Sequence, residues 1–288
     1  MHAKTSRLAA PRAAGGKSGA SAISVRGLGR TFHNSGRGQD IVAFENIDFD
    51  VADGEFLTVV GPSGCGKSTL LNTLAGLQEP TTGEIRINDE VPADRTKLFG
   101  YMFQKDLLFP WRSIRQNIGL GLEVEGRSKS AAGSRANELA GRFGLAPFLD
   151  KYPAQLSGGM RQRVALMRTL ACDRPMLLLD EPFGALDALT RSLMQEWLLE
   201  IWAQDRRTVV FITHDIDESV FLSDRVLVMS ARPGRIQQEV AVPLVRPRTA
   251  EISASDEFAH VKAKLVESVR AEGLKAFREA EQIQEGGS

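Results

Sequence analysis

The chain has 288 residues, enough for one large α/β domain or two smaller ones. Its 36 basic and 36 acidic residues cancel, so no overall positive field marks a nucleic-acid-binding protein, and we expect no nucleic acid partner. Two cysteines, Cys65 and Cys172, are too few for a disulfide framework and are typical of a reducing compartment. No apolar run approaches the roughly 18 residues of a membrane span, and no secretory signal opens the chain. We therefore expect a soluble protein that reaches a membrane only through a partner.

The first 22 residues are rich in Ala, Gly and Ser and contain Lys and Arg but no acid. This composition is typical of a disordered extension, so we expect residues 1–22 to form a disordered basic leader. A targeting peptide or a basic arm has a similar composition and stays the alternative.

Strands and helices alternate along the rest of the chain. Alternating apolar residues predict half-buried strands. These are AISVRGL (22–28), NIDFDV (46–51) and GEIRINDE (83–90). Compact apolar runs predict buried parallel strands. These are EFLTVVG (55–61), PMLLLDEP (175–182), TVVFITHD (208–215) and RVLVMS (225–230). We expect helices over 67–77, 129–144, 157–172, 187–204 and 216–222. The alternation predicts an α/β fold with a doubly wound, mainly parallel sheet.

The last segment, 255–269, has an apolar stripe at helical spacing. Its members are Phe258, Val261, Leu265 and Val269. Such a stripe predicts a C-terminal helix that docks on the core.

A glycine-rich loop follows the first buried strand and precedes a helix. Residues 61–68 match the pattern G-x-x-x-x-G-K-S in full, and the strand before and helix after them are the context this phosphate loop requires. Backbone N–H groups of such a loop surround phosphates, Lys67 reaches the β- and γ-phosphates, and the Ser68 hydroxyl can ligate Mg²⁺. The predicted nucleotide site comprises Gly61, Pro62, Ser63, Gly64, Cys65, Gly66, Lys67, Ser68 and Thr69. Because Cys65 lies at a helix start beside Lys67, we expect a low thiol pKa and a reactive thiolate.

Acidic residues and a histidine follow the later buried strands. Asp180 ends MLLLD and can hold Mg²⁺, usually through water. Glu181 follows, and in an extended chain it points away from Asp180, which leaves it free to polarise an attacking water. His214 comes after the next strand, where strand ends gather at a nucleotide crevice, so we expect it beside the γ-phosphate. Gln104 follows the strand-like LFGYMF and can offer its carbonyl to Mg²⁺ and its amide to water.

An apolar loop and an isolated phenylalanine admit two interpretations each. Leu107, Leu108, Phe109, Pro110 and Trp111 either fill the core of a small helical lobe or form an exposed socket for a partner helix. Phe32, in GRTF, either stacks on a purine or packs in the core. No N-K-x-D element that reads guanine is present.

A second glycine motif opens the helix predicted over 157–172. Ser157 can cap this helix, Gly158 and Gly159 permit close approach of a phosphate, and Gln162 adds a donor one turn on. A helix start of this kind favours an anion. Since the glycine loop already serves the chain's own nucleotide, the phosphate at this second site needs another explanation.

The complete set of motifs resembles the ATP-binding subunit of an ATP-binding cassette (ABC) transporter. The matching pieces are GPSGCGKST, MFQ, LSGGMRQR, LLLDEP, ALD and THD, in the family order, and the resemblance covers roughly residues 23–245. It implies a P-loop NTPase of ABC type with an antiparallel β edge and a helical subdomain over about 105–172, followed by a C-terminal helical extension and tail over 246–288. It also implies ATP and Mg²⁺ as ligands.

The resemblance further implies how the residues act. In the family two copies dimerise head to tail, so Ser157, Gly158 and Gly159 would close on ATP held by the partner's glycine loop. Glu181 would be the general base, Phe32 the aromatic that stacks on adenine, and Asp187 part of the loop linking the two sites. His214 and Lys67 complete the expected catalytic set.

A finer resemblance concerns the transport branch. FPW, YPAQLSGGMRQR and PLVRPR resemble the nitrate/sulfonate/taurine branch of bacterial importers. This implies two membrane permease subunits that contact residues 107–111, an external substrate-binding protein, and a peripheral place on the cytoplasmic face of the inner membrane. The alternatives are a non-transport ABC ATPase of DNA repair, chromosome organisation or translation, and a P-loop kinase or small GTPase, which leaves the Ser-Gly-Gly helix unexplained.

Overall fold

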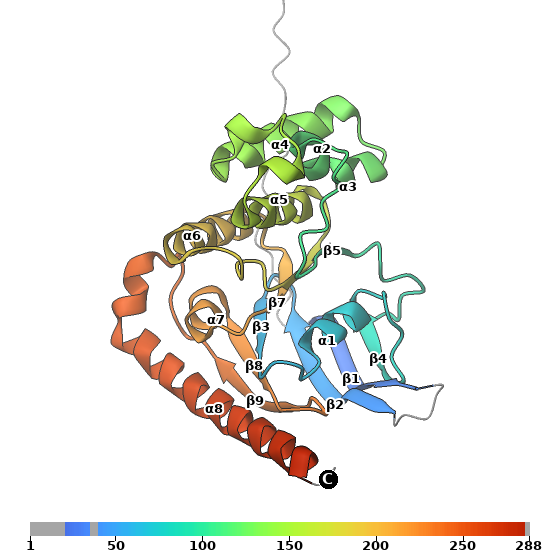
Figure 1. Cartoon of the computed structure of the whole chain (residues 1–288), viewed down its shortest axis with the longest axis vertical. Coiled ribbons are helices and arrows are strands. Elements are labelled where there is room, and N and C mark those ends of the chain that lie inside the picture. Colours follow the sequence, from blue (N-terminus) through green and yellow to red (C-terminus); the bar gives the residue numbers. More distant parts are fainter. Residues whose placement is uncertain (1–20, 35–39, 286–288) are drawn as a thin grey trace, which may run out of the picture.

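The computed structural model describes residues 21–34 and 40–285. The predicted leader therefore lies outside the described residues, except that Ser21 and Ala22 already belong to the first strand. Figure 1 shows two layers of sheet below a lobe of helices, with a long helix along one edge. Among the described residues, no helix is long and apolar enough to cross a membrane.

An antiparallel sheet forms the outer layer of the lower part. It contains β1 (Ser21–Phe32), β2 (Ile41–Ala52) and β4 (Thr82–Ile87), in the order β2-β1-β4. Its inward side chains include Val25, Phe44 and Ile85, all buried, as the alternating pattern predicts.

A six-stranded sheet lies at the centre. Its strands are β3 (Phe56–Val60), β5 (Phe99–Met102), β6 (Met176–Asp180), β7 (Thr208–Ile212), β8 (Arg225–Met229) and β9 (Ile236–Ala241). The order is β5-β6-β7-β3-β8-β9, and only the pairing of β8 with β9 is antiparallel. Every residue of β3, β6 and β7 is buried. Both faces of the sheet are thus covered, and the expected α/β fold with an antiparallel edge is confirmed.

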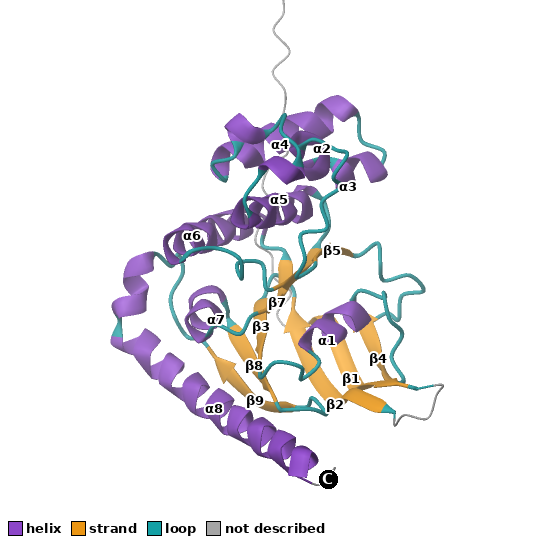
Figure 2. Cartoon of the chain, in the orientation of Figure 1, coloured by secondary structure: helices purple, strands orange, loops and turns teal. Residues whose placement is uncertain are grey.

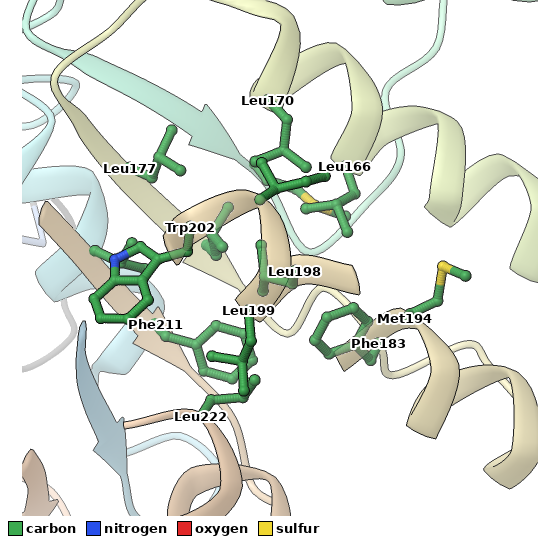
Figure 3. Packing of buried hydrophobic residues seen from close by; sticks show 14 of the residues in the cluster. Leu166, Leu170, Leu177, Phe183, Met194, Leu198, Leu199, Trp202, Phe211 and Leu222 are labelled. Carbon is green, nitrogen blue, oxygen red and sulfur yellow. The ribbon is translucent and has the colours of Figure 1, made fainter. Parts of the chain in front are cut away.

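The two faces of the central sheet carry separate cores. One packs against the antiparallel sheet and α1 (Lys67–Leu74). The other packs against α5 (Gly158–Ala171), α6 (Ala188–Asp205) and α7 (Ile216–Leu222). Figure 3 shows this second core, where Trp202 and Leu198 of α6 meet Phe211 of β7. Such packing fixes the strand ends from which the functional loops depart.

The upper lobe consists of helices, as Figure 2 shows. They are α2 (Ile114–Ile118), α3 (Leu120–Val124), α4 (Lys129–Arg142), the short helices η1 (Ala146–Phe148) and η2 (Pro153–Gln155), and α5. The small helical subdomain of the expected fold is therefore present, and its bounds of about 105–172 stay a prediction.

The C-terminal segment is more helical than the sequence pattern indicates. After η3 (Ala250–Ala254), α8 runs over Asp256–Glu285 and so extends well beyond residue 269. Phe258, Val261 and Leu265 are buried, which supports the predicted docking face. Arg248 holds the start of this segment against the core. Its buried guanidinium donates to the carbonyls of Val220, Phe221, Ser223, Val242 and Leu244.

Candidate functional site

The glycine loop connects β3 to α1 at the carboxyl end of the central sheet. Gly64 and Gly66 have φ angles of 77° and 102°, in the left-handed region that glycine adopts without strain. Lys67 is buried, and its Nζ donates to the carbonyls of Gly61 at 2.9 Å and Pro62 at 3.0 Å. Ser63 and Ser68 are exposed, while Thr69 is half-buried. The loop thus encloses its lysine and presents polar atoms outward, as a phosphate cradle requires.

A turn after β8 supports this loop from behind. A Cβ on Gly234 would lie 2.2 Å from the Cys65 carbonyl oxygen, so only glycine allows this approach. The Arg232 guanidinium donates to the Gly64 carbonyl at 3.0 Å and 3.2 Å. The sequence motifs do not predict this support. Arg232, in ARPGR (231–235), lies 168 residues from Gly64 along the chain, and only the fold brings the two together.

The expected low pKa of the Cys65 thiol is wrong. The side chain is 1 % exposed, and burial raises the pKa of its thiol; neighbouring Lys67, with Nζ 3.8 Å from Sγ, offsets only part of this effect. Local sequence placed the thiol beside a cation but could not show the apolar neighbours that desolvate the thiolate.

Asp180 lies at the last position of β6, with its carboxylate inside the protein. It is 3 % exposed, and its Oδ1 has no hydrogen-bond partner among the described residues. Burial raises the pKa of this carboxyl, whereas the Ser68 hydroxyl lowers it. An unpartnered buried carboxylate oxygen beside a hydroxyl fits Mg²⁺, which takes oxygen ligands. In the described part of the chain, no group of three or more His, Cys, Asp or Glu residues is placed so that it could hold a metal ion.

The backbone at Glu181 differs from the extended chain that the sequence predicts. Its backbone is not extended, since its φ of 47° is in the left-handed region. Its carboxylate is 20 % exposed and lies between two side chains. Nδ1 of His214 is 3.2 Å from Oε1, and Nε2 of Gln104 donates to Oε2 at 3.2 Å. Gln104 and His214, which follow β5 and β7, therefore meet at the carboxylate of Glu181, which follows β6.

The second glycine motif lies at the exposed start of α5. Ser157 caps the helix, with Oγ accepting from the Met160 N–H at 3.3 Å. Ser157 and Gly158 are exposed, and a Cβ on Gly158 would find no atom closer than 3.9 Å. A Cβ on Gly159, by contrast, would lie 3.1 Å from Leu186 Cδ2. Gly158 therefore leaves room for an incoming group, whereas Gly159 lets the helix pack on the loop after Glu181.

The prediction that Gln162 donates to a phosphate is wrong, because its side chain points into the protein. It is 5 % exposed, and its Nε2 donates to the Glu181 carbonyl of the same chain at 3.3 Å. Helical geometry explains the correction, since five residues after Ser157 correspond to a rotation of about 140° around the helix axis.

Asp187 and Phe32 are the remaining predicted site residues. Asp187 caps α6, and its Oδ1 accepts from the Thr190 N–H at 3.0 Å; this bond lowers the pKa of its carboxyl. Phe32 is half-buried against the core of the antiparallel sheet, with the Arg30 guanidinium 4.8 Å from its ring centroid. Both earlier interpretations of Phe32 thus keep a basis, and its stacking on adenine stays a prediction.

The apolar loop before α2 divides between core and surface. Leu108 is buried, whereas Leu107, Phe109 and Trp111 are 51 %, 37 % and 72 % exposed. The Phe109 and Trp111 rings stack at 5.2 Å with 11° between their planes. A cavity of about 410 Å³ lies beside Trp111, with Arg115, Lys129 and Ala132 among its lining residues. Exposed stacked aromatic rings next to a cavity are typical of an interaction surface.

Comparison with known proteins identifies the family. Residues 44–184 match the family model described as "ABC transporter". A Brucella abortus protein named only as ATP-binding is 49 % identical over 228 residues, which cover 79 % of this chain and 88 % of the relative. The aliphatic sulfonates import ATP-binding protein SsuB of Bacillus cereus is 42 % identical, over 88 % of this chain and 97 % of the relative. The dimeric, ADP- and phosphate-bound ATP-binding cassette MJ0796 has a TM-score of 0.69 and 31 % identity, over 77 % of this chain and all of that one. The chain therefore belongs to the ABC transporter family, as one of its ATP-binding subunits and an ATPase.

Proposed function

We propose that the chain works as a head-to-tail dimer in which each ATP is held between two copies. The observation that carries this proposal is the pair of glycine motifs. Residues 61–69 form a phosphate cradle within the chain, and the exposed start of α5 offers a second one with Ser157 and Gly158. The solved cassette MJ0796 is itself dimeric. The second cradle would close on the partner's nucleotide.

The chain's own side chains would then divide the work of hydrolysis. Lys67 leaves the carbonyls of Gly61 and Pro62 to approach the β- and γ-phosphates. The Glu181 carboxylate polarises the attacking water, and His214 donates to the γ-phosphate from the other side of that carboxylate. Bound Mg²⁺ supplies positive charge at the phosphate oxygens, and Asp180, Ser68 and Gln104 are the residues that would hold it.

We further propose that this ATPase energises an importer of a small nutrient, of which sulfonates are one example. The name of the Bacillus cereus relative supports import of aliphatic sulfonates. The exposed cluster of Leu107, Phe109 and Trp111 supports a permease partner. An external substrate-binding protein and a place on the inner face of the inner membrane follow from that assignment. A non-transport ATPase of DNA repair, chromosome organisation or translation is the competing function.

Purification of the tagged chain from its own cells distinguishes these functions. Import predicts recovery of a polytopic membrane protein in detergent, in stoichiometric amount. Recovery of a nucleic-acid or ribosomal factor in place of a membrane protein would overturn the proposal. The ligand of the binding protein associated with that permease then identifies the nutrient.

A further inference from the structure

The start of α5 and the catalytic glutamate are physically joined within one chain. Gln162 lies on the buried side of α5, and its Nε2 donates to the backbone carbonyl of Glu181 at 3.3 Å. One turn earlier, Gly159 packs against Leu186 and the Ala185 carbonyl, so α5 touches the loop after Glu181 at a second point. A shift of α5 therefore moves this loop.

The backbone at Glu181 is held by specific hydrogen bonds. Its φ of 47° is rarely adopted by residues other than glycine, so this backbone conformation is strained. Its N–H donates to the Ile212 carbonyl at 3.0 Å, and its carbonyl accepts from the Gly184 N–H at 3.2 Å as well as from Gln162. The amide of Gln162 thus helps to keep a peptide in an unfavourable conformation.

That conformation decides where the Glu181 carboxylate stands. From this backbone orientation the side chain reaches Gln104 and His214, with both contacts at 3.2 Å. A rotation at Glu181 would withdraw the carboxylate from both neighbours. Small displacements of a catalytic group are costly, because proton transfer requires hydrogen-bond geometry.

We infer that Gln162 is a positioning residue that orients Glu181 for hydrolysis and makes this orientation depend on the place of α5. Gln162 is buried, and it acts through its hydrogen bond to the Glu181 backbone carbonyl. The positioning is a property of one chain. What moves α5, namely a partner's γ-phosphate at Ser157 and Gly158, rests on the proposed dimer.

The test is a double-mutant cycle measured by single-turnover hydrolysis of Mg-ATP in the full chain. Gln162→Met keeps the side chain's length and burial but removes the donor. We expect the rate to fall about 10- to 30-fold, with the apparent KM for ATP changed less than about twofold. In a Glu181→Gln background the same change should lower the residual rate less than about threefold, because no positioned base is left to lose.

Thr169→Val is the matched control. Thr169 lies on the same helix and is buried, and its hydroxyl donates to the Ala165 carbonyl at 3.1 Å and to the Tyr101 carbonyl at 3.4 Å, not to Glu181. This variant should lose stability without the selective loss of rate. If Gln162→Met does not fold, Gln162→Asn retains an amide that falls short of the carbonyl, and it should behave in the same direction.

Equal losses of rate in both backgrounds, a loss confined to KM, or a rate within twofold of the unsubstituted chain would each overturn the inference. The proposed dimer is tested separately, by measuring the molecular size of the Glu181→Gln variant with Mg-ATP. A monomer there contradicts the proposed pairing but leaves the outcome of the cycle valid for one chain.

Discussion

The two glycine motifs of this chain differ in how their polar groups are satisfied. At the glycine loop, Lys67 is bonded to loop carbonyls, and the nearby Glu181 has Gln104 and His214 within 3.2 Å. At the start of α5, Ser157 bonds only to its own helix in the described structure, and Gly158 faces solvent. The first site is assembled within the chain, whereas the second is open. This difference supports the proposed dimer, in which another copy supplies the phosphate at the second motif.

The largest effect is expected at the assembled site. Lys67→Ala removes the cation that the loop encloses, so ATP binding and turnover should fall together. The fall in turnover should be at least about 10²- to 10³-fold, the range for removing one preorganised electrostatic group. Steady-state hydrolysis and titration with Mg-ATP measure both quantities. Turnover near the original rate would mean that this loop is not the hydrolysing site.

Ser157→Arg should separate binding from turnover. The bulky cation blocks approach of a second copy but leaves the glycine loop untouched, so the Kd for ATP should stay within about threefold. Turnover should fall about 10²-fold, because the closed site never forms. Simultaneous loss of binding would place α5 beside the nucleotide of its own chain and remove the distinction between the two motifs.

Trp111→Asp tests the lobe surface away from both motifs. Trp111 is 72 % exposed and stacked on Phe109, so its loss should leave folding and hydrolysis by the isolated chain unchanged. Binding of the permease should weaken by about 2 kcal/mol or more, roughly 30-fold in Kd, as for an aromatic anchor. Exposed Val124, also on the lobe, offers Val124→Asp as the matched control. Equal recovery of the permease with both variants would contradict a role for Trp111.

The smallest effect is expected on stability, at the buried carboxyl of Glu218. Glu218 is buried on α7, just after His214, and burial raises its pKa to about 7. A raised pKa means that the folded state holds the proton more tightly, so stability is lost as pH rises from about 4.5 through 7. Glu218→Gln should therefore stabilise the chain by ~1–3 kcal/mol at pH 8 and little at pH 5. Denaturant unfolding at both pH values measures this, and an equal effect at both would contradict the shift.

Much of the fold follows from local patterns in the chain. The buried runs of β3, β6 and β7, the cap at Ser157 and the apolar stripe from Phe258 to Val269 all depend on short-range patterns, and the structure has them. Gln104, Glu181 and His214 lie together because each follows a predicted strand, and parallel strands bring their carboxyl ends together.

What the sequence could not predict depends on neighbours distant along the chain. The burial of Cys65, the turn that supports it and the inward direction of Gln162 arise from packing between elements. The left-handed backbone of Glu181 is likewise held by Ile212 and Gly184 rather than by its own preference. Local propensity carries no information on such contacts.

The most direct test of the account is the size of the Glu181→Gln variant with saturating Mg-ATP, measured by light scattering. This change removes the base but keeps an amide of nearly the same shape, so ATP should stay bound and hold two copies together. We predict a stable dimer with ATP, a monomer without it, and a rate of hydrolysis reduced by at least about 10²-fold. A variant that stays monomeric and hydrolyses ATP at the original rate would contradict both the shared site and the role of Glu181.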